Sequence, residues 1–134
     1  MRTHQVIIVH TTITVPLASA LAFAQEPENF SQWAAGLARS LRRTERGWIA
    51  DTPAGEAVVR FSAPNEHGVL DHWVRVAGRP EIYVPLRMIA NGDGTEVELI
   101  LYRQPEMSDA DFEHDAELVR RDLATLKQVL EGRQ

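Results

Sequence analysis

Residues 13–33 read ITVPLASALAFAQEPENFSQW, and the fold expected for the chain depends on how this segment is interpreted. It has two interpretations. In the first it ends a secretory signal, with Ala22-Phe23-Ala24 as a small-x-small cleavage site. In the second a strand leads through Pro16 into a short helix, because proline is tolerated in the first helical turn, where its missing N–H is not needed.

The residues before Pro16 favour the second interpretation. A secretory signal needs a continuous apolar segment after a positive start, yet QVIIVHTTITV, residues 5–15, is interrupted by His10 and by threonines. Its many β-branched residues are typical of a strand. We therefore predict a strand followed by a helix over residues 16–24.

A second short helix is expected directly afterwards. Pro27 can begin it, and Phe30, Trp33 and Leu37 recur at helical spacing. We expect the helix to end near Gly36. The sequence assigns Trp33 only to packing between the two small helices.

The middle of the chain shows strand patterns separated by turn signals. The expected strands are 38–44, 46–51, 56–62, 67–76, 81–90 and 95–103. Sequential strands of this kind predict an antiparallel meander.

The chain closes with a long predicted helix over residues 109–131. Ser108 and Asp111 form a capping-box pattern at its start. One face of the helix carries an apolar stripe of Phe112, Ala116, Val119, Leu123, Leu126 and Leu130. That stripe must pack on another apolar surface.

Hairpin register follows from the pairing that places apolar residues together. We expect Ser62 opposite His67, Ala77 opposite Glu81, and Ala90 opposite Thr95. One face of the sheet is then almost wholly apolar. The other face carries a ladder in which Asp71 lies opposite Arg87 and Arg87 opposite Glu98, which we interpret as solvent-facing and structural.

Composition sets limits on the class of protein. The 134 residues are 44% apolar and 25% charged, which predicts one domain over residues 1–134. There is no cysteine, so thiol chemistry and cysteine-ligated zinc are excluded. A net charge of -5 argues against nucleic acid as a partner, and no apolar run is long enough for a membrane span. We expect a cytoplasmic protein.

The element order of strand, two short helices, antiparallel strands and long helix resembles the helix-grip fold of the START-like superfamily, also called SRPBCC or Bet v1-like. The opening quoted above is similar to the family's opening. Within the superfamily, GVLDHWV, IYVPLRMIANGDGTEVELILYRQP and MSDADFEHDAELVRRDLATLKQVLE resemble small bacterial members described as polyketide cyclase/dehydratase-like.

The resemblance implies an α+β fold in which a curved antiparallel sheet wraps around the C-terminal helix. It also implies a cavity between sheet and helix that takes a small hydrophobic ligand, with no cofactor. The predicted lining residues are Trp48, Phe61, Leu70, Val84, Leu86, Met88, Leu99, Leu101, Phe112 and Val119. Large apolar residues on an inward face are also what a filled core requires.

Two residues are candidates for chemistry. His72 lies on the predicted apolar face, where it could act as general acid or base in a cyclisation or dehydration. Alternatively it is a buried histidine satisfied by a backbone carbonyl or a water. Arg103 could stabilise an enolate oxygen, or it could pair with Glu106 or with the acidic start of the last helix. No pattern indicates a metal site.

Three functions remain open. The first is ligand binding with cyclase or dehydratase activity, and the second is a non-catalytic lipid or metabolite carrier. The third is a protein-interaction module that uses the outer sheet face with Trp73, Tyr83 and Tyr102, where Trp73 could mark a homodimer contact.

Overall fold

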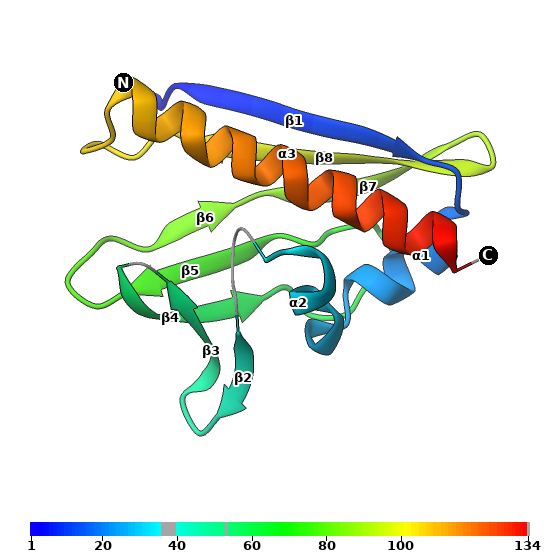
Figure 1. Ribbon diagram of the computed structural model, residues 1–134, viewed down its shortest axis with the longest axis horizontal. Coiled ribbons are helices and arrows are strands. Elements are labelled where there is room, and N and C mark those ends of the chain that lie inside the picture. Colours follow the sequence, from blue (N-terminus) through cyan, green and yellow to red (C-terminus); the bar gives the residue numbers. More distant parts are fainter. Residues whose placement is uncertain (36–39, 53, 134) are drawn as a thin grey trace.

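The computed structural model describes residues 1–35, 40–52 and 54–133 (Figure 1). Its elements, in chain order, are β1 (Val6–Ile13), α1 (Leu17–Ala24), the 3-10 helix η1 (Pro27–Asn29), α2 (Phe30–Trp33), β2 (Leu41–Thr44), β3 (Gly47–Thr52), β4 (Gly55–Phe61), β5 (His72–Val76), β6 (Ile82–Val84), β7 (Leu86–Asn91), β8 (Gly94–Tyr102) and α3 (Asp109–Gly132). The predicted α+β class and the strand-then-helix interpretation of the opening are confirmed. The expected positions of Gly36 and Leu37 lie outside the described residues.

The antiparallel strands form two hydrogen-bonded sheets. Sheet A has the order β1-β8-β7, and sheet B has the order β2-β3-β4-β5-β6. The two sheets meet where Pro85 separates β6 from β7, which the sequence predicts as one strand over 81–90. Proline cannot donate to a strand ladder, but its carbonyl still accepts from the Ile100 N–H at 3.0 Å. The curved surface therefore bends at Pro85.

The long helix α3 lies along sheet A, α1 lies near the C-terminal end of α3, and α2 lies beneath α3 near the middle of the molecule (Figure 1). The predicted capping box is confirmed: the Ser108 hydroxyl accepts from the Asp111 N–H, and the Asp111 carboxylate accepts from the Ser108 N–H. The predicted stripe from Phe112 to Leu130 is buried. No helix in the described part of the chain is long and apolar enough to cross a membrane.

The hairpin register agrees with the sequence in one case and differs in two. Ala90 lies opposite Thr95, as predicted. His72 instead pairs with Val84 and Phe61 with His72, which shifts the two other hairpins from their predicted pairings. Both shifts are by an even number of residues, so each side chain keeps its predicted face.

The larger shift arises because residues 62–71 form a loop and only 72–76 form the strand predicted for 67–76. The Asn65 side-chain oxygen accepts from the backbone N–H groups of His67 and Val69 at 2.9 and 3.2 Å. Gly68 has a φ of 81°, and a Cβ on it would lie 1.9 Å from the Met88 carbonyl oxygen. Only glycine fits this close approach, so the chain turns here.

The ladder on the outer face needs two corrections, the first being that the backbone partner of Arg87 on this side is Val69 and not Asp71. Arg87 lies opposite Glu98 as predicted, but Asp71 is only 4% exposed and is not solvent-facing. It accepts hydrogen bonds from the Tyr83 hydroxyl, the Leu86 N–H and the Arg87 guanidinium. Asp71 is buried on the outer face because the side chains of Tyr83 and Arg87 and the backbone of Leu86 close around it.

Candidate functional site

His72 is the first residue of β5, faces inward and is only 1% exposed. Its Nδ1 lies 3.3 Å from the Leu70 carbonyl oxygen, so the ring donates from Nδ1 and Nε2 carries the acceptor lone pair. Burial lowers the pKa of His72 to about 4, against the smaller opposing effects of the Leu70 carbonyl and the Asp71 charge. The imidazole is therefore neutral at physiological pH and offers an acceptor to the interior.

A small pocket adjoins this histidine, and we refer to it as the His72 pocket. Its lining residues are Ala24, Gln25, Phe30, Trp33, Phe61, Ser62, Val69, Leu70, His72 and Leu86. The pocket volume is about 20 Å³. That is room for roughly one water molecule, which needs polar partners to stay.

Aromatic rings surround the imidazole on the side of α2. The ring of Phe30 meets His72 edge-on at 5.5 Å, and the ring of Phe61 lies 6.1 Å away. Phe30 also meets Phe61 at 5.3 Å and Trp33 at 5.2 Å. These rings hold His72 in an apolar setting, which explains its low pKa.

Trp33 brings an unused donor to the same pocket. Its side chain is 1% exposed, and its indole N–H has no hydrogen-bond partner among the described residues. A buried donor without a partner costs about 1–3 kcal/mol. Sequence reasoning assigned Trp33 only to packing, because the spacing of Phe30 and Trp33 gives no sign of which tertiary neighbours they meet.

Partly buried apolar side chains continue from the pocket over the inner face of the sheet. We refer to the following residues as the inner-face strip: Trp48, Phe61, Val74, Ile82 and Leu101. Phe61 connects the pocket to the strip, since its ring also lies 6.4 Å from that of Trp48. Val74 pairs with Ile82 two strand positions beyond the His72–Val84 pair and therefore on the same face.

The predicted lining residues fall into separate environments. Phe61, Leu70 and Leu86 line the His72 pocket. Trp48 and Leu101 lie in the inner-face strip. The others are fully buried: Val84, Met88, Leu99 and Val119 belong to the hydrophobic cluster, and Phe112 packs under the Arg103 guanidinium. The four cluster residues pack in the core between sheet and helix.

Arg103 is held at the start of α3 and does not line the His72 pocket. Its guanidinium donates to the Met107 carbonyl at 2.9 Å, to the Gln5 side chain at 3.1 Å and to Asp109 at 2.6 Å. These contacts fasten the loop before α3 to the strand end. They match the structural alternative, in which Arg103 pairs with the acidic start of the helix.

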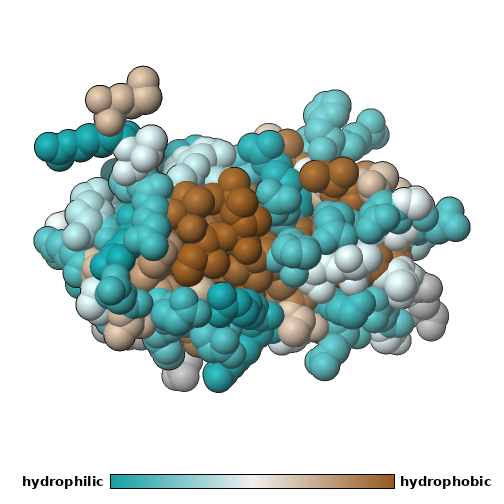
Figure 2. Space-filling model, turned by 90° about the horizontal axis from the view of Figure 1, so that it is seen from above, coloured by the Kyte–Doolittle hydropathy of each residue, from teal (hydrophilic) through white to brown (hydrophobic). Residues whose placement is uncertain are grey.

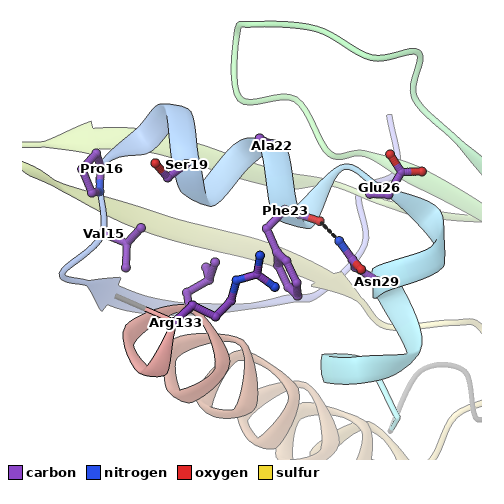
Figure 3. A pocket seen from close by; sticks show the side chains of 9 residues that line it. Val15, Pro16, Ser19, Ala22, Phe23, Glu26, Asn29 and Arg133 are labelled. Carbon is purple, nitrogen blue, oxygen red and sulfur yellow. Dashed lines mark hydrogen bonds between the residues drawn. The ribbon is translucent and has the colours of Figure 1, made fainter.

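A larger groove lies on the surface between α1 and the end of α3, and sequence reasoning did not identify it. It has a volume of about 530 Å³ and is lined by Val15, Pro16, Ser19, Ala22, Phe23, Glu26, Asn29, Leu130 and Arg133. Arg133 points across the groove to the Phe23 ring, 4.6 Å from its centroid, and Asn29 donates to the Phe23 carbonyl (Figure 3). The α1–η1 segment thus separates this groove from the His72 pocket.

The described residues contain no cluster of three or more histidine, aspartate or glutamate side chains that could hold a metal ion. The polar side chains that line the His72 pocket are those of Gln25, Trp33, Ser62 and His72.

Comparisons with known proteins identify the fold. No protein-family model and no curated protein matches the chain. Among solved structures, a START superfamily protein from Mycobacterium smegmatis is 11% identical, with a TM-score of 0.68 over 98% of this chain and 100% of that one. The chain has the START-superfamily fold.

Two further structures have similar START-like geometry. An uncharacterised protein from Bacillus thuringiensis is 13% identical, with a TM-score of 0.72 over 94% of this chain and 98% of that one. CalU16 from Micromonospora echinospora is 19% identical, with a TM-score of 0.68 over 96% of this chain and 76% of that one. At these identities the START-like likeness concerns the fold, and function must be argued from the site.

Proposed function

We propose that this START-like protein binds a small, largely apolar molecule that carries one uncharged polar group. The polar group enters the His72 pocket, and the apolar body lies along the inner-face strip. The observation that carries the proposal is the pairing of a neutral buried acceptor on His72 with a partnerless buried donor on Trp33 in one pocket.

The pocket chemistry selects the polar group. A hydroxyl can donate to His72 Nε2 and accept from the Trp33 N–H, whereas a carbonyl can only accept. A charged group is disfavoured, because the neutral imidazole and the aromatic walls offer it no counter-charge. We therefore favour a phenol or an alcohol over a carboxylate.

The apolar body needs more space than the pocket provides. The inner-face strip supplies partly exposed apolar surface next to Phe61, and binding would remove that surface from water. Helix α2 is only four residues long and borders the pocket through Phe30 and Trp33. Small movements of those two rings would enlarge the opening.

The proposal can be tested with 2-naphthol and naphthalene as probes in equilibrium titrations. The wild-type protein is expected to bind 2-naphthol more tightly than naphthalene by about tenfold, the effect of one or two buried hydrogen bonds. Trp33→Phe and His72→Phe should each remove most of this preference. The matched control is Trp73→Phe, because Trp73 stacks on Tyr83 at the outer face.

An equal preference in wild type and both pocket variants would contradict the proposal. Loss of binding in Ser19→Trp, which fills the α1–α3 groove, with no change in Trp33→Phe, would place the ligand in that groove instead.

A second candidate function is catalysis, favoured by the free Nε2 of His72 at the edge of the pocket. A histidine with so low a pKa is a weak base and is not protonated to act as an acid at neutral pH. The cyclase or dehydratase activity implied by the resemblance, with Arg103 as oxyanion partner, stays a prediction. Uptake of deuterium by the enolisable probe 2-tetralone, followed by NMR, would support it only if His72→Phe abolishes the exchange.

A further inference from the structure

Strand β1 forms one edge of sheet A, and helix α3 contacts the C-terminal end of this edge. It is eight residues long, and among the described residues it pairs only with β8. In an antiparallel pair, successive residues direct their backbone groups alternately toward and away from the partner strand. The Arg103 N–H donates to the Gln5 carbonyl, so odd-numbered residues of this strand face β8 and even-numbered ones face outward.

Helix α3 covers the outward groups at the C-terminal end of the strand. The Thr12 carbonyl accepts from Lys127 at 2.6 Å, and the Thr14 N–H donates to Glu131 at 2.9 Å. No described residue makes the equivalent contact to the outward backbone groups of Val6, Ile8 or His10. The N-terminal half of this edge therefore presents backbone N–H and C=O groups that have no partner among the described residues.

The open half also lacks the features that usually protect an edge. Exposed edge strands normally carry charged side chains or proline. Between residues 3 and 15 the chain has no lysine, arginine, aspartate or glutamate. The side chains of Val6 and Ile8 are 43% and 52% exposed. Figure 2 shows a continuous hydrophobic area on the side of the molecule along which β1 runs.

The edges at β7 and β2 are protected. The free side of β7 is covered by the preceding loop, since the Met88 N–H donates to the Gly68 carbonyl and the Leu70 N–H to the Leu86 carbonyl. Strand β2 is short and carries Arg42, which pairs with Asp51 and Glu56. The contrast singles out the N-terminal half of β1.

We propose that two copies of this chain associate through β1, as antiparallel strands related by a two-fold axis at Ile8. Ile8 then lies opposite Ile8 of the second copy, and Val6 lies opposite His10. All of these residues direct their backbone groups outward, so each pair exchanges hydrogen bonds, and sheet A continues across the axis.

The open edge is uncharged and carries the exposed side chains of Val6 and Ile8, so it is complementary to a second copy of itself. The net charge of -5 makes two whole copies repel each other, which weakens the association. The pairing places no like-charged residues of β1 opposite each other, because residues 3–15 carry no lysine, arginine, aspartate or glutamate. One strand pair buries less area than a standard interface, so the dimer is expected to be reversible and to depend on concentration.

Sedimentation of the purified protein over a range of concentrations tests the association. The mass should rise from 15.1 kDa for one chain toward twice that value. Ile8→Lys places two ammonium groups side by side at the axis and should raise the dissociation constant at least about tenfold. Ile89→Lys is the matched control, because Ile89 is 55% exposed on β7, away from this edge.

Amide hydrogen exchange by NMR tests the geometry without any substitution. In the dimer the amides of Val6, Ile8 and His10 should become more protected as concentration rises, whereas those of Ile7 and Val9, which already face β8, should not change. Val6→Lys serves in place of Ile8→Lys if circular dichroism shows that the latter is unfolded.

Three results would overturn the proposal. They are a protein that stays monomeric at all concentrations, a dimer that Ile8→Lys and Val6→Lys leave intact, and a dimer without the alternating amide protection. The last result would indicate association through another surface, such as the face that carries Trp73.

Discussion

Asp71 and His72 are neighbours in the sequence, yet they lie in opposite chemical situations. Asp71 is charged and accepts hydrogen bonds from the Tyr83 hydroxyl at 2.6 Å, the Leu86 N–H at 2.9 Å and the Arg87 guanidinium at 2.7 and 2.8 Å. His72 is neutral and makes one long contact to the Leu70 carbonyl, and no residue in the described ranges bonds to its Nε2.

The difference separates a structural polar group from a candidate functional one. Burial alone would raise the pKa of Asp71, but the hydrogen bonds from Arg87, Tyr83 and Leu86 outweigh it and lower the pKa to about 2. Asp71 therefore has no capacity left for a ligand. His72 and the Trp33 N–H retain theirs, which is why the proposed binding site lies on their side of the sheet.

The largest effect is expected from Asp71→Ala. The change leaves the Leu86 N–H buried without a partner and breaks a charge pair with Arg87, so the free energy of unfolding should fall by about 3 kcal/mol or more. Urea denaturation measures this loss. Asp51→Ala is the control, since Asp51 makes its contacts to Ser40 and Arg42 at the surface, and it should shift the midpoint much less. Similar losses of unfolding free energy in both variants would show that the buried contacts of Asp71 stabilise the fold no more than the surface contacts of Asp51.

The next largest effect is a dependence of stability on pH that belongs to His72. Its folded pKa of about 4 lies below the unfolded value of about 6.5, so the unfolded chain binds the extra proton between these values. Stability is full above pH 6.5 and falls as the pH drops toward 4, by roughly 2–3 kcal/mol between pH 7.5 and 4.5.

Subtracting the His72→Phe profile isolates this contribution, because other groups titrate equally in both proteins. Asp71 does not contribute in the same window. Its folded pKa is depressed, so its stabilising effect is lost only as the pH falls below about 4 toward 2. Equal slopes for wild type and His72→Phe above pH 4.5 would mean that the imidazole is solvated.

A smaller effect is expected from Arg103→Met. The substitution removes the hydrogen bonds to Met107 and Asp109, and we expect a loss of about 1 kcal/mol in the free energy of unfolding without any change in probe binding. Arg120→Met, at an exposed pair with Glu113 on the same helix, is the control. Weaker probe binding at unchanged stability would instead favour a ligand-facing role for Arg103.

The smallest effect on stability is expected from Trp33→Phe, within about 1 kcal/mol of wild type. The variant loses packing volume but also removes a buried N–H that has no partner in the described structure, and the two changes oppose each other. Chemical denaturation measures the difference. A loss as large as that of Asp71→Ala would show that the indole N–H is well bonded. The difference between the satisfied Asp71 and the unsatisfied groups of the His72 pocket would then not exist.

Several features of the fold could be predicted because they depend on local spacing. The capping box at Ser108 fixes the start of α3, and the β-branched run before Pro16 fixes β1. Two further signals lie in single residues: Pro85 divides a strand, and Asn65 with Gly68 turns the chain before β5. Both act through backbone geometry, which apolar periodicity does not report.

The candidate site could be predicted only in part. The alternation of strand residues placed His72 and Phe61 on the inner face, and an even shift of register cannot move them from it. The size of the pocket depends on Phe30 and Trp33 from a distant segment, and the role of Arg103 depends on the conformation of the loop before α3. Neither follows from spacing along the chain.

The spacing of apolar residues along the chain is enough to predict which side of each strand and helix faces the interior, because that choice repeats with the period of the backbone. Three properties depend on the folded chain: the burial of Asp71 among donors, the space beside His72 with room for roughly one water, and the open half of the β1 edge. These properties arise where segments far apart in the sequence meet, and burial and pairing are set by those distant partners rather than by the residue's own neighbours.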